Sequence, residues 1–339
     1  MNKEIRKMYT ISKAILIVLV VFAHATRMYT DVGAFSPVRQ SEVLKNVTTF
    51  IYQFHMPVFM CVSGAIYGYG IDSGKYEKYF KFVGQKFKRL IIPYLFVGIL
   101  IVVPTVKYTG LDNKTFLNQV LYNIILAKDN RHLWYIIALF WIFVLCGLFR
   151  KVLRRDSIII FGIVFVVAYV LRRYAYLVNV LALGSALTYF IYFIMGIYFN
   201  KVLNKLMKKG IKWNKYRFLV YILLGLSGAA MVLNVYSKFC KDLVAAGFGM
   251  VFVFALSFIL TCEDKSGRAD KIWAHIGRSS YGVYLFHPMI IYILYYFLHQ
   301  KNIEPWVCAS VVAALSWGVS EILIWIIRKI PGLKVLIGE

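Results

Sequence analysis

Acidic residues are scarce in this 339-residue sequence, which holds 15 Asp and Glu against 40 Lys and Arg. Charged residues make up only 16% of the chain, whereas soluble domains have about a quarter. The 7 prolines and 23 glycines are scattered and form no linker or low-complexity segment. We therefore exclude a soluble globular fold and expect one membrane-embedded domain over residues 1–339, with no soluble domain appended.

Cysteine is also sparse. Five residues, an odd number, are spread over the chain with spacings that suit neither a disulfide framework nor a metal site. We expect them to be buried or interfacial thiols and predict no metal site. They are Cys61, Cys146, Cys240, Cys262 and Cys308.

Long apolar runs are abundant. Hydrophobic residues make up 60% of the sequence, and the mean hydropathy is +0.68. A helix needs about 20 apolar residues to cross the hydrocarbon core of a bilayer. The sequence therefore predicts an all-α, polytopic integral membrane protein with about ten transmembrane helices. The predicted spans are 11–27, 46–68, 90–106, 133–149, 157–171, 184–200, 218–235, 243–261, 280–298 and 305–327.

The basic residues predict the orientation of these spans. Connections on the side of the N-terminus hold more than twice as many Lys and Arg residues as the opposite set. Cytoplasmic loops are enriched in these residues, so we place both termini in the cytoplasm. The net charge of +25 is explained by this pattern and by contact with anionic lipids, and we expect no nucleic-acid partner.

Two ionisable residues lie in the first predicted span. Lys13 and His24 are eleven residues apart, close to three helical turns, so both side chains lie on one face about 16 Å apart. Lys13 is then near the cytoplasmic edge, with His24 past the midplane. Ionisable groups in a bilayer are costly and usually functional. The alternative is that Lys13 extends to the interface and His24 forms an interhelical hydrogen bond.

The second predicted span contains His55 and Pro57, followed by Ser63 and Gly64. His55 lies at a depth comparable to that of His24, which indicates a polar cavity shared by the two histidines. Pro57 should bend the helix because it lacks a backbone N–H. Ser63 and Gly64 allow close helix packing.

Further candidate residues stand at the ends of other spans. Lys86, Lys88 and Arg89 precede the third span on the predicted cytoplasmic face and suit a ligand with several phosphates. His132 and Trp134 open the fourth span at the outer surface, where an interfacial aromatic belt is the simpler explanation. The ninth span is too polar for lipid contact and is expected to line a cavity. Its residues are Ser280, Tyr281, Tyr284 and His287.

In this order, on ten spans, these residues resemble the acyltransferase 3 family, membrane-bound bacterial enzymes that O-acetylate sugars and cell-envelope polymers. The resemblance covers nearly the whole chain. It rests on Lys13 to His24, on residues 54–64, on Lys86-x-Lys88-Arg89 before Ile92-Pro93-Tyr94, on residues 132–135 and on residues 280–288. The first-helix cation is often Arg in the family, and Lys13 lacks the bidentate geometry of Arg.

The resemblance implies an O-acyltransferase of the bacterial cytoplasmic membrane. It would move an acyl group, most often acetyl, from cytoplasmic acyl-CoA to a hydroxyl of a sugar or cell-envelope polysaccharide. Acetyl-CoA is then a donor co-substrate, and no tightly bound cofactor is expected. Lys13, Lys86, Lys88 and Arg89 would bind the nucleotide phosphates. His24 would be the general base or carry the acyl group transiently, with His55, Ser63 and Tyr284 as candidates for orienting the base or stabilising the oxyanion.

The acceptor is left open between an exported glycan, a lipid-linked sugar, peptidoglycan and a smaller hydroxylated molecule. Some family members carry a fused hydrolase-like domain that receives the acyl group. Here the membrane domain or a separate partner protein would engage the acceptor, and a homo-oligomer is equally open. The rival interpretation is a proton-coupled transporter or flippase for a small or lipid-linked substrate. Against it, Glu321 is the only clear intramembrane carboxylate, and the sequence has no inverted repeat.

Overall fold

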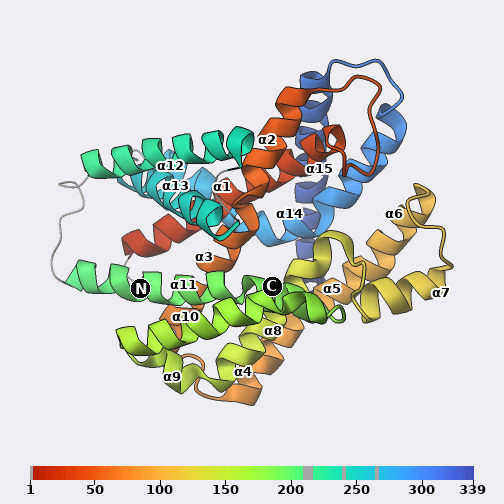
Figure 1. Cartoon of the computed structure of the whole chain (residues 1–339). Coiled ribbons are helices and arrows are strands. Elements are labelled where there is room, and N and C mark those ends of the chain that lie inside the picture. The colour runs from red at the N-terminus through yellow and green to blue at the C-terminus, as the bar shows by residue number, and fades with distance from the viewer. Residues whose placement is uncertain (1–2, 209–216, 239–241, 264–266) are drawn as a thin grey trace. The chain divides into compact units, whose positions relative to one another are not determined.

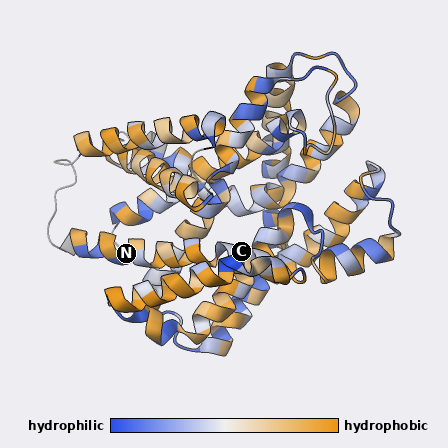
Figure 2. Cartoon of the chain, viewed as in Figure 1, coloured by the Kyte–Doolittle hydropathy of each residue, from blue (hydrophilic) through white to orange (hydrophobic). Residues whose placement is uncertain are grey.

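The computed structural model describes residues 3–208, 217–238, 242–263 and 267–339. Within these ranges every regular element is a helix, and nine helices are long and apolar enough to cross a membrane. Figure 2 shows hydrophobic residues along most of the helices, with hydrophilic residues gathered in the connections. The all-α membrane architecture predicted from composition is confirmed.

The fifth predicted span, at 157–171, is not among these nine and corresponds to the apolar helix α10 (Ile158–Arg173). This helix has 16 residues, which gives a length of about 24 Å, shorter than the roughly 30 Å hydrocarbon core. Its side chains are largely exposed, including Ile158 and Ile159. A total of ten spans and the cytoplasmic position of both termini remain predictions.

Two compact units make up the chain, and each is described by itself. The first unit comprises residues 1–62 and 203–321. Its helix α1 packs against α13 and α14, and α12 lies beside α13 (Figure 1). The bounds of its helices are α1 Lys3–Thr26, α2 Glu42–Tyr52, α3 His55–Asp72, α12 Arg217–Ser237, α13 Asp242–Glu263, α14 Arg268–Leu298 and α15 Pro305–Lys329, with α3 and α15 continuing into the second unit.

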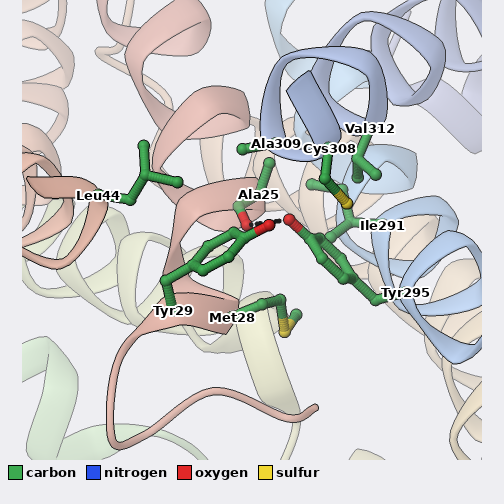
Figure 3. Close-up of a cluster of buried hydrophobic side chains, with 9 residues drawn as sticks. All are labelled: Ala25, Met28, Tyr29, Leu44, Ile291, Tyr295, Cys308, Ala309 and Val312. Atoms are coloured by element: carbon green, nitrogen blue, oxygen red, sulfur yellow. Dashed lines mark hydrogen bonds between the residues drawn. The ribbon is translucent and has the colours of Figure 1, made fainter. Parts of the chain in front are cut away.

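A buried cluster packs the C-terminal end of α1 against α14 and α15 (Figure 3). The Tyr295 hydroxyl donates a hydrogen bond to the backbone oxygen of Ala25 at 2.9 Å. This carbonyl lies in the last turn of α1, where a helix leaves its backbone acceptors without intrahelical partners. Tyr295 therefore fixes the end of the helix that carries His24. The cluster consists of Ala25, Met28, Tyr29, Leu44, Ile291, Tyr295, Cys308, Ala309 and Val312.

The second unit comprises residues 63–202 and 322–339. Gly64 allows its α3 and α11 to touch, because a Cβ at this position would lie 2.0 Å from the backbone oxygen of Phe193. The close packing predicted for Gly64 is therefore observed. The remaining helices of the unit are α4 Tyr79–Lys86, α5 Ile92–Val97, α6 Val103–Tyr108, α7 Phe116–Asn118, α8 Trp134–Leu148, α9 Arg150–Arg154, α10 and α11 Leu183–Lys208.

Two prolines interrupt the helix that runs from α4 to α6. A π-helical turn, Phe87–Ile91, ends just before Pro93, and a second, Gly98–Val102, ends just before Pro104. Proline has no N–H to donate to the carbonyl four residues earlier, so the preceding turn widens. The first of these π turns carries Lys88 and Arg89.

Candidate functional site

Two histidines meet in the first unit. His24 on α1 and His287 on α14 have ring centroids 5.0 Å apart, with an angle of 48° between the ring planes. His287 is fully buried, and its Nδ1–H donates to the backbone oxygen of Val283 at 2.7 Å. Because a carbonyl only accepts, the proton of the neutral ring is on Nδ1, and Nε2 is the nitrogen able to accept a proton.

Tyr52 joins this pair to the second predicted histidine. The ring of Tyr52 lies 6.3 Å from that of His24 and 4.7 Å from that of His55. His55 is buried and donates Nδ1–H to the backbone oxygen of Ile51 at 3.0 Å, so its Nε2 is also the basic nitrogen. The two histidines predicted to share a polar region are linked through an aromatic residue that the sequence analysis did not single out.

Arg27 completes the cluster, one turn beyond His24. Its guanidinium carbon lies 5.9 Å from the centroid of the Tyr52 ring. The hydroxyl proton of Tyr52 and the buried Nε–H of Arg27 meet no acceptor among the described residues, and the Arg27 guanidinium interacts with the Tyr52 hydroxyl oxygen. Buried donors nearly always have a hydrogen-bond acceptor, so two buried donors without one beside a histidine indicate a functional role. A negative oxygen that forms during a reaction would provide their acceptor.

A break in the second span positions these residues. The helix predicted at 46–68 is two helices, α2 and α3, separated by Gln53 and Phe54. Pro57 causes the break because it cannot donate to the carbonyl of Gln53. The Gln53 side chain bonds α12 instead, donating to the Met231 backbone oxygen at 3.4 Å and accepting from Asn234 Nδ2 at 3.0 Å. Tyr52 therefore ends one helix and His55 begins the next.

The other predicted residues of α14 differ in their contacts, and the ring of Tyr284 is in contact with that of His287. The ring of Tyr284 lies 6.4 Å from that of His287. Ser280 donates to the backbone oxygen of Gly277 at 3.0 Å, which satisfies its hydroxyl within the helix, and Tyr281 is half-buried. Pro288 interrupts the ladder of backbone bonds directly after His287.

Intramembrane Glu321 has partners on α14. It accepts a hydrogen bond from Ser279 at 2.6 Å, and His275 Nε2 lies 3.7 Å from its second oxygen. This satisfied carboxylate gives a structural reason for the one acidic residue predicted inside the membrane.

Hydrogen bonds and an ion pair hold the predicted cytoplasmic end of α1 to α13 and α14. Lys7 pairs with Asp270 at 2.5 Å and donates to the backbone oxygen of Thr261 at 3.1 Å. Ser12 donates to Ser257 on α13 at 2.9 Å. Lys13, the predicted phosphate ligand on this helix, is half-buried.

The other predicted phosphate ligands belong to the second unit and differ from one another. Lys88 and Arg89 are exposed on the π turn. Lys86 instead points its ammonium into aromatic rings, 3.8 Å from the centroid of Phe143 and 5.5 Å from that of Phe82. Such cation–π contacts hold a lysine strongly when water is excluded, so Lys88 and Arg89 are better placed to meet a phosphate.

Three further predicted residues also belong to the second unit. The Ser63 hydroxyl lies 3.2 Å from that of Tyr135 on α8. His132 is buried in the short turn before α8. Trp134 is half-buried, with its ring 4.8 Å from that of Tyr189.

The four described cysteines do not belong to this cluster. Cys61, Cys146 and Cys308 are buried free thiols and Cys262 is half-buried, while Cys240 lies outside the described residues. In the part of the chain that the structure describes, no group of three or more His, Cys, Asp or Glu residues could hold a metal ion.

A comparison with protein-family models matches residues 10–325 to the acyltransferase domain of the acyltransferase 3 family. The chain belongs to the acyltransferase 3 family. No curated protein and no solved structure matches it. The matched range contains all the residues of the histidine cluster. This acyltransferase 3 protein is therefore a membrane acyltransferase with several membrane-crossing helices.

Sequence reasoning missed Arg27 and Tyr52 and ranked His287 below His55. In the sequence Arg27 is only one of the Lys and Arg residues in the connections used to predict the orientation of the spans. One signal was available for Tyr52, since it lies five residues before Pro57 and three before His55, at the point where proline must open the helix. No signal in the sequence predicted that His287 would be the nearest histidine to His24.

Proposed function

We propose that this protein is an O-acyltransferase that moves an acetyl group from cytoplasmic acetyl-CoA to a hydroxyl of a saccharide. The observation that carries the proposal is the cluster of His24, His287, Tyr52 and Arg27. It combines a proton acceptor with two buried donor groups whose protons meet no acceptor among the described residues. These are the two elements that acyl transfer requires.

In the proposed reaction His24 takes the proton of the acceptor hydroxyl as its oxygen attacks the thioester carbonyl. The new C–O bond forms, and the carbonyl oxygen becomes negative. Arg27 Nε–H and the Tyr52 hydroxyl donate hydrogen bonds to this oxygen. The C–S bond then breaks, and the thiolate of CoA takes the proton from His24, which yields the ester and free CoA. His287 orients the ring of His24 and is itself held by Val283.

Lys88 and Arg89, on the π turn of the second unit, are the proposed ligands of the CoA phosphates. An Arg and a Lys side by side on an exposed π turn give one bidentate and one compact cation for a multiply charged ligand. Lys86 is proposed to support this turn from its aromatic surroundings rather than to touch the ligand.

Purified protein in detergent, incubated with radiolabelled acetyl-CoA and a panel of glycans, tests the proposal. Wild-type protein should release CoA and label a glycan, whereas His24→Ala should lose transfer by at least about a hundredfold. His299→Ala is the control, because His299 is another helix-end histidine whose ring contacts Phe35 and which is not one of the cluster residues. Equal turnover by wild type and His24→Ala would remove His24 from the mechanism.

If the protein is a transporter or flippase instead, it should move a saccharide without releasing CoA. Proteoliposomes containing the protein would take up or flip a labelled saccharide without consuming acetyl-CoA. Such uptake with no CoA release would overturn the proposed enzyme.

A further inference from the structure

The second unit contains a cavity of about 580 Å³ that none of the proposed catalytic residues enters. It lies between the segment before α8, the end of α10 with the connection that follows, and the first turn of α11. These connections are on the side predicted to face away from the cytoplasm. A volume of this size is typical of sites for small organic ligands.

Two aromatic residues and several uncharged polar residues line the cavity. Trp134 and Tyr176 are its aromatic residues, and Asn179 and Ser185 supply an amide and a hydroxyl, whereas the amide of Asn130 donates to the Tyr94 hydroxyl at 3.3 Å. An aromatic face is electron-rich and attracts the polarised C–H groups of a sugar ring. Amides both donate and accept, as the hydroxyl groups of a sugar require. The lining therefore has the chemistry of a saccharide site.

The charges add a preference for acidic sugars. The lining includes Lys128, Arg131 and Arg172, with Asp129 as its one anion. Lys128 Nζ donates to the Tyr122 hydroxyl at 3.1 Å and Arg172 Nη1 to the Thr188 backbone oxygen at 3.0 Å, so these cations set the charge of the wall while part of their bonding is already met. Arg131 and Asp129 lie 3.7 Å apart. A net positive lining favours a ligand that carries carboxylate or phosphate groups.

The backbone around the cavity is strained. Among the described residues, five that are not glycine have a positive φ, and four of these, Ala127, Arg131, Leu181 and Ala182, belong to or adjoin the lining. Each costs about 1–2 kcal/mol, and such strain is concentrated at ligand sites. The Leu181 N–H donates to the Leu126 backbone oxygen at 2.7 Å, which locks the two strained segments together.

Gly184 allows the connection after α10 to pack closely against α11 beside the cavity. A Cβ on Gly184 would lie 2.5 Å from the backbone oxygen of Val178 and 2.7 Å from that of Ala175. The connection after α10 can approach α11 only because this residue has no side chain. The cavity is thus shaped by specific backbone features rather than by loose packing.

We propose that this cavity binds an acidic saccharide, the acyl acceptor of the enzyme or a part of it. The proposal rests on the O-acyltransferase function given above, from which it takes the saccharide as substrate. Binding is nevertheless measurable without any transfer.

Isothermal titration calorimetry of the purified protein with trigalacturonate, maltotriose and phosphatidylglycerol micelles tests the proposal. Trigalacturonate should bind with saturation and maltotriose more weakly. Tyr176→Ala and Asn179→Ala should each weaken trigalacturonate binding by about tenfold. Tyr174→Ala is the matched control, because Tyr174 is an exposed tyrosine of the same segment that does not line the cavity.

Several outcomes would overturn the proposal. These are no binding of trigalacturonate by wild type, equal weakening by Tyr174→Ala and Tyr176→Ala, or binding of phosphatidylglycerol that displaces trigalacturonate. His24→Ala separates this proposal from the proposed function. It should bind trigalacturonate as wild type does while losing transfer, so a failure of transfer chemistry leaves the binding result standing.

Discussion

Replacing Tyr52 with Phe should reduce acyl transfer without reducing the stability of the protein. The change removes one hydroxyl and leaves the ring in contact with those of His24 and His55. If that hydroxyl stabilises the oxyanion, its loss should lower turnover by about a hundredfold. The hydroxyl proton has no acceptor among the described residues, and leaving a buried donor without an acceptor costs about 1–3 kcal/mol. Tyr52→Phe should therefore be as stable as wild type or slightly more so.

Tyr295→Phe, in the same unit, should instead reduce the stability of the protein. This change removes a hydroxyl that donates to the backbone oxygen of Ala25 at 2.9 Å. The buried carbonyl loses its donor, so unfolding should become easier by about 1–3 kcal/mol. Both changes are Tyr→Phe at buried or largely buried positions close to α1, but the Tyr295 hydroxyl donates to a backbone oxygen, whereas the Tyr52 hydroxyl proton has no described acceptor.

Radiolabelled transfer and thermal unfolding, measured on the same detergent preparations, separate the two effects. Tyr52→Phe should show a low turnover and an unchanged or raised unfolding midpoint, and Tyr295→Phe a lowered midpoint. Full turnover by Tyr52→Phe would refute the oxyanion role. A midpoint lowered as much as in Tyr295→Phe would show that the hydroxyl has a structural partner and would refute the reasoning.

Three further predictions follow from single contacts. Lys88→Ala combined with Arg89→Ala should weaken binding of CoA by at least about tenfold at low salt, whereas Lys151→Ala should not, and calorimetry at two ionic strengths checks this. Gly64→Ala should destabilise the protein by about 1–3 kcal/mol because its Cβ meets the Phe193 backbone, whereas Gly162→Ala, with open space around it, should be neutral or stabilising in thermal unfolding. Burial alone would raise the pKa of Asp112, but hydrogen bonds from Lys114 and Asn123 lower it below its ordinary value of 3.8. Its contribution to stability is therefore present above that value and lost as the pH falls through the lower folded-state pKa, so Asp112→Asn should flatten the acid arm of the stability curve.

The fold was predictable because the bilayer imposes a simple rule on sequence. Each helix that crosses it must be apolar for about 20 residues, and this pattern is visible without any tertiary information. The rule is weakest for short helices such as α10, whose 16 residues do not place it among the nine membrane-crossing helices. It also gives no sign of internal breaks, so the span at 46–68 was predicted as one bent helix, although Pro57 divides it into α2 and α3.

The catalytic cluster was only partly predictable, for a different reason. Depth along a helix follows from residue spacing, so the sequence could place His24 and His55 at similar levels. It could not predict which faces of α1, α2 and α14 would meet. His287 proved to be the neighbour of His24, and Tyr52 the residue that joins His24 to His55.

The break at Gln53 and Phe54 explains how a short segment can supply two parts of the cluster. In a continuous helix the carbonyl of Gln53 would face Pro57 without a donor, a costly state inside a membrane. Here the chain opens, and the Gln53 side chain secures the opening through bonds to α12. The opening sets the position of Tyr52, whose ring stays in contact with that of His55, its neighbour three residues on, and also reaches that of His24. Proline at position 57 thus has a role in building the site as well as in bending the helix, and Pro57→Ala should impair transfer more than it impairs folding.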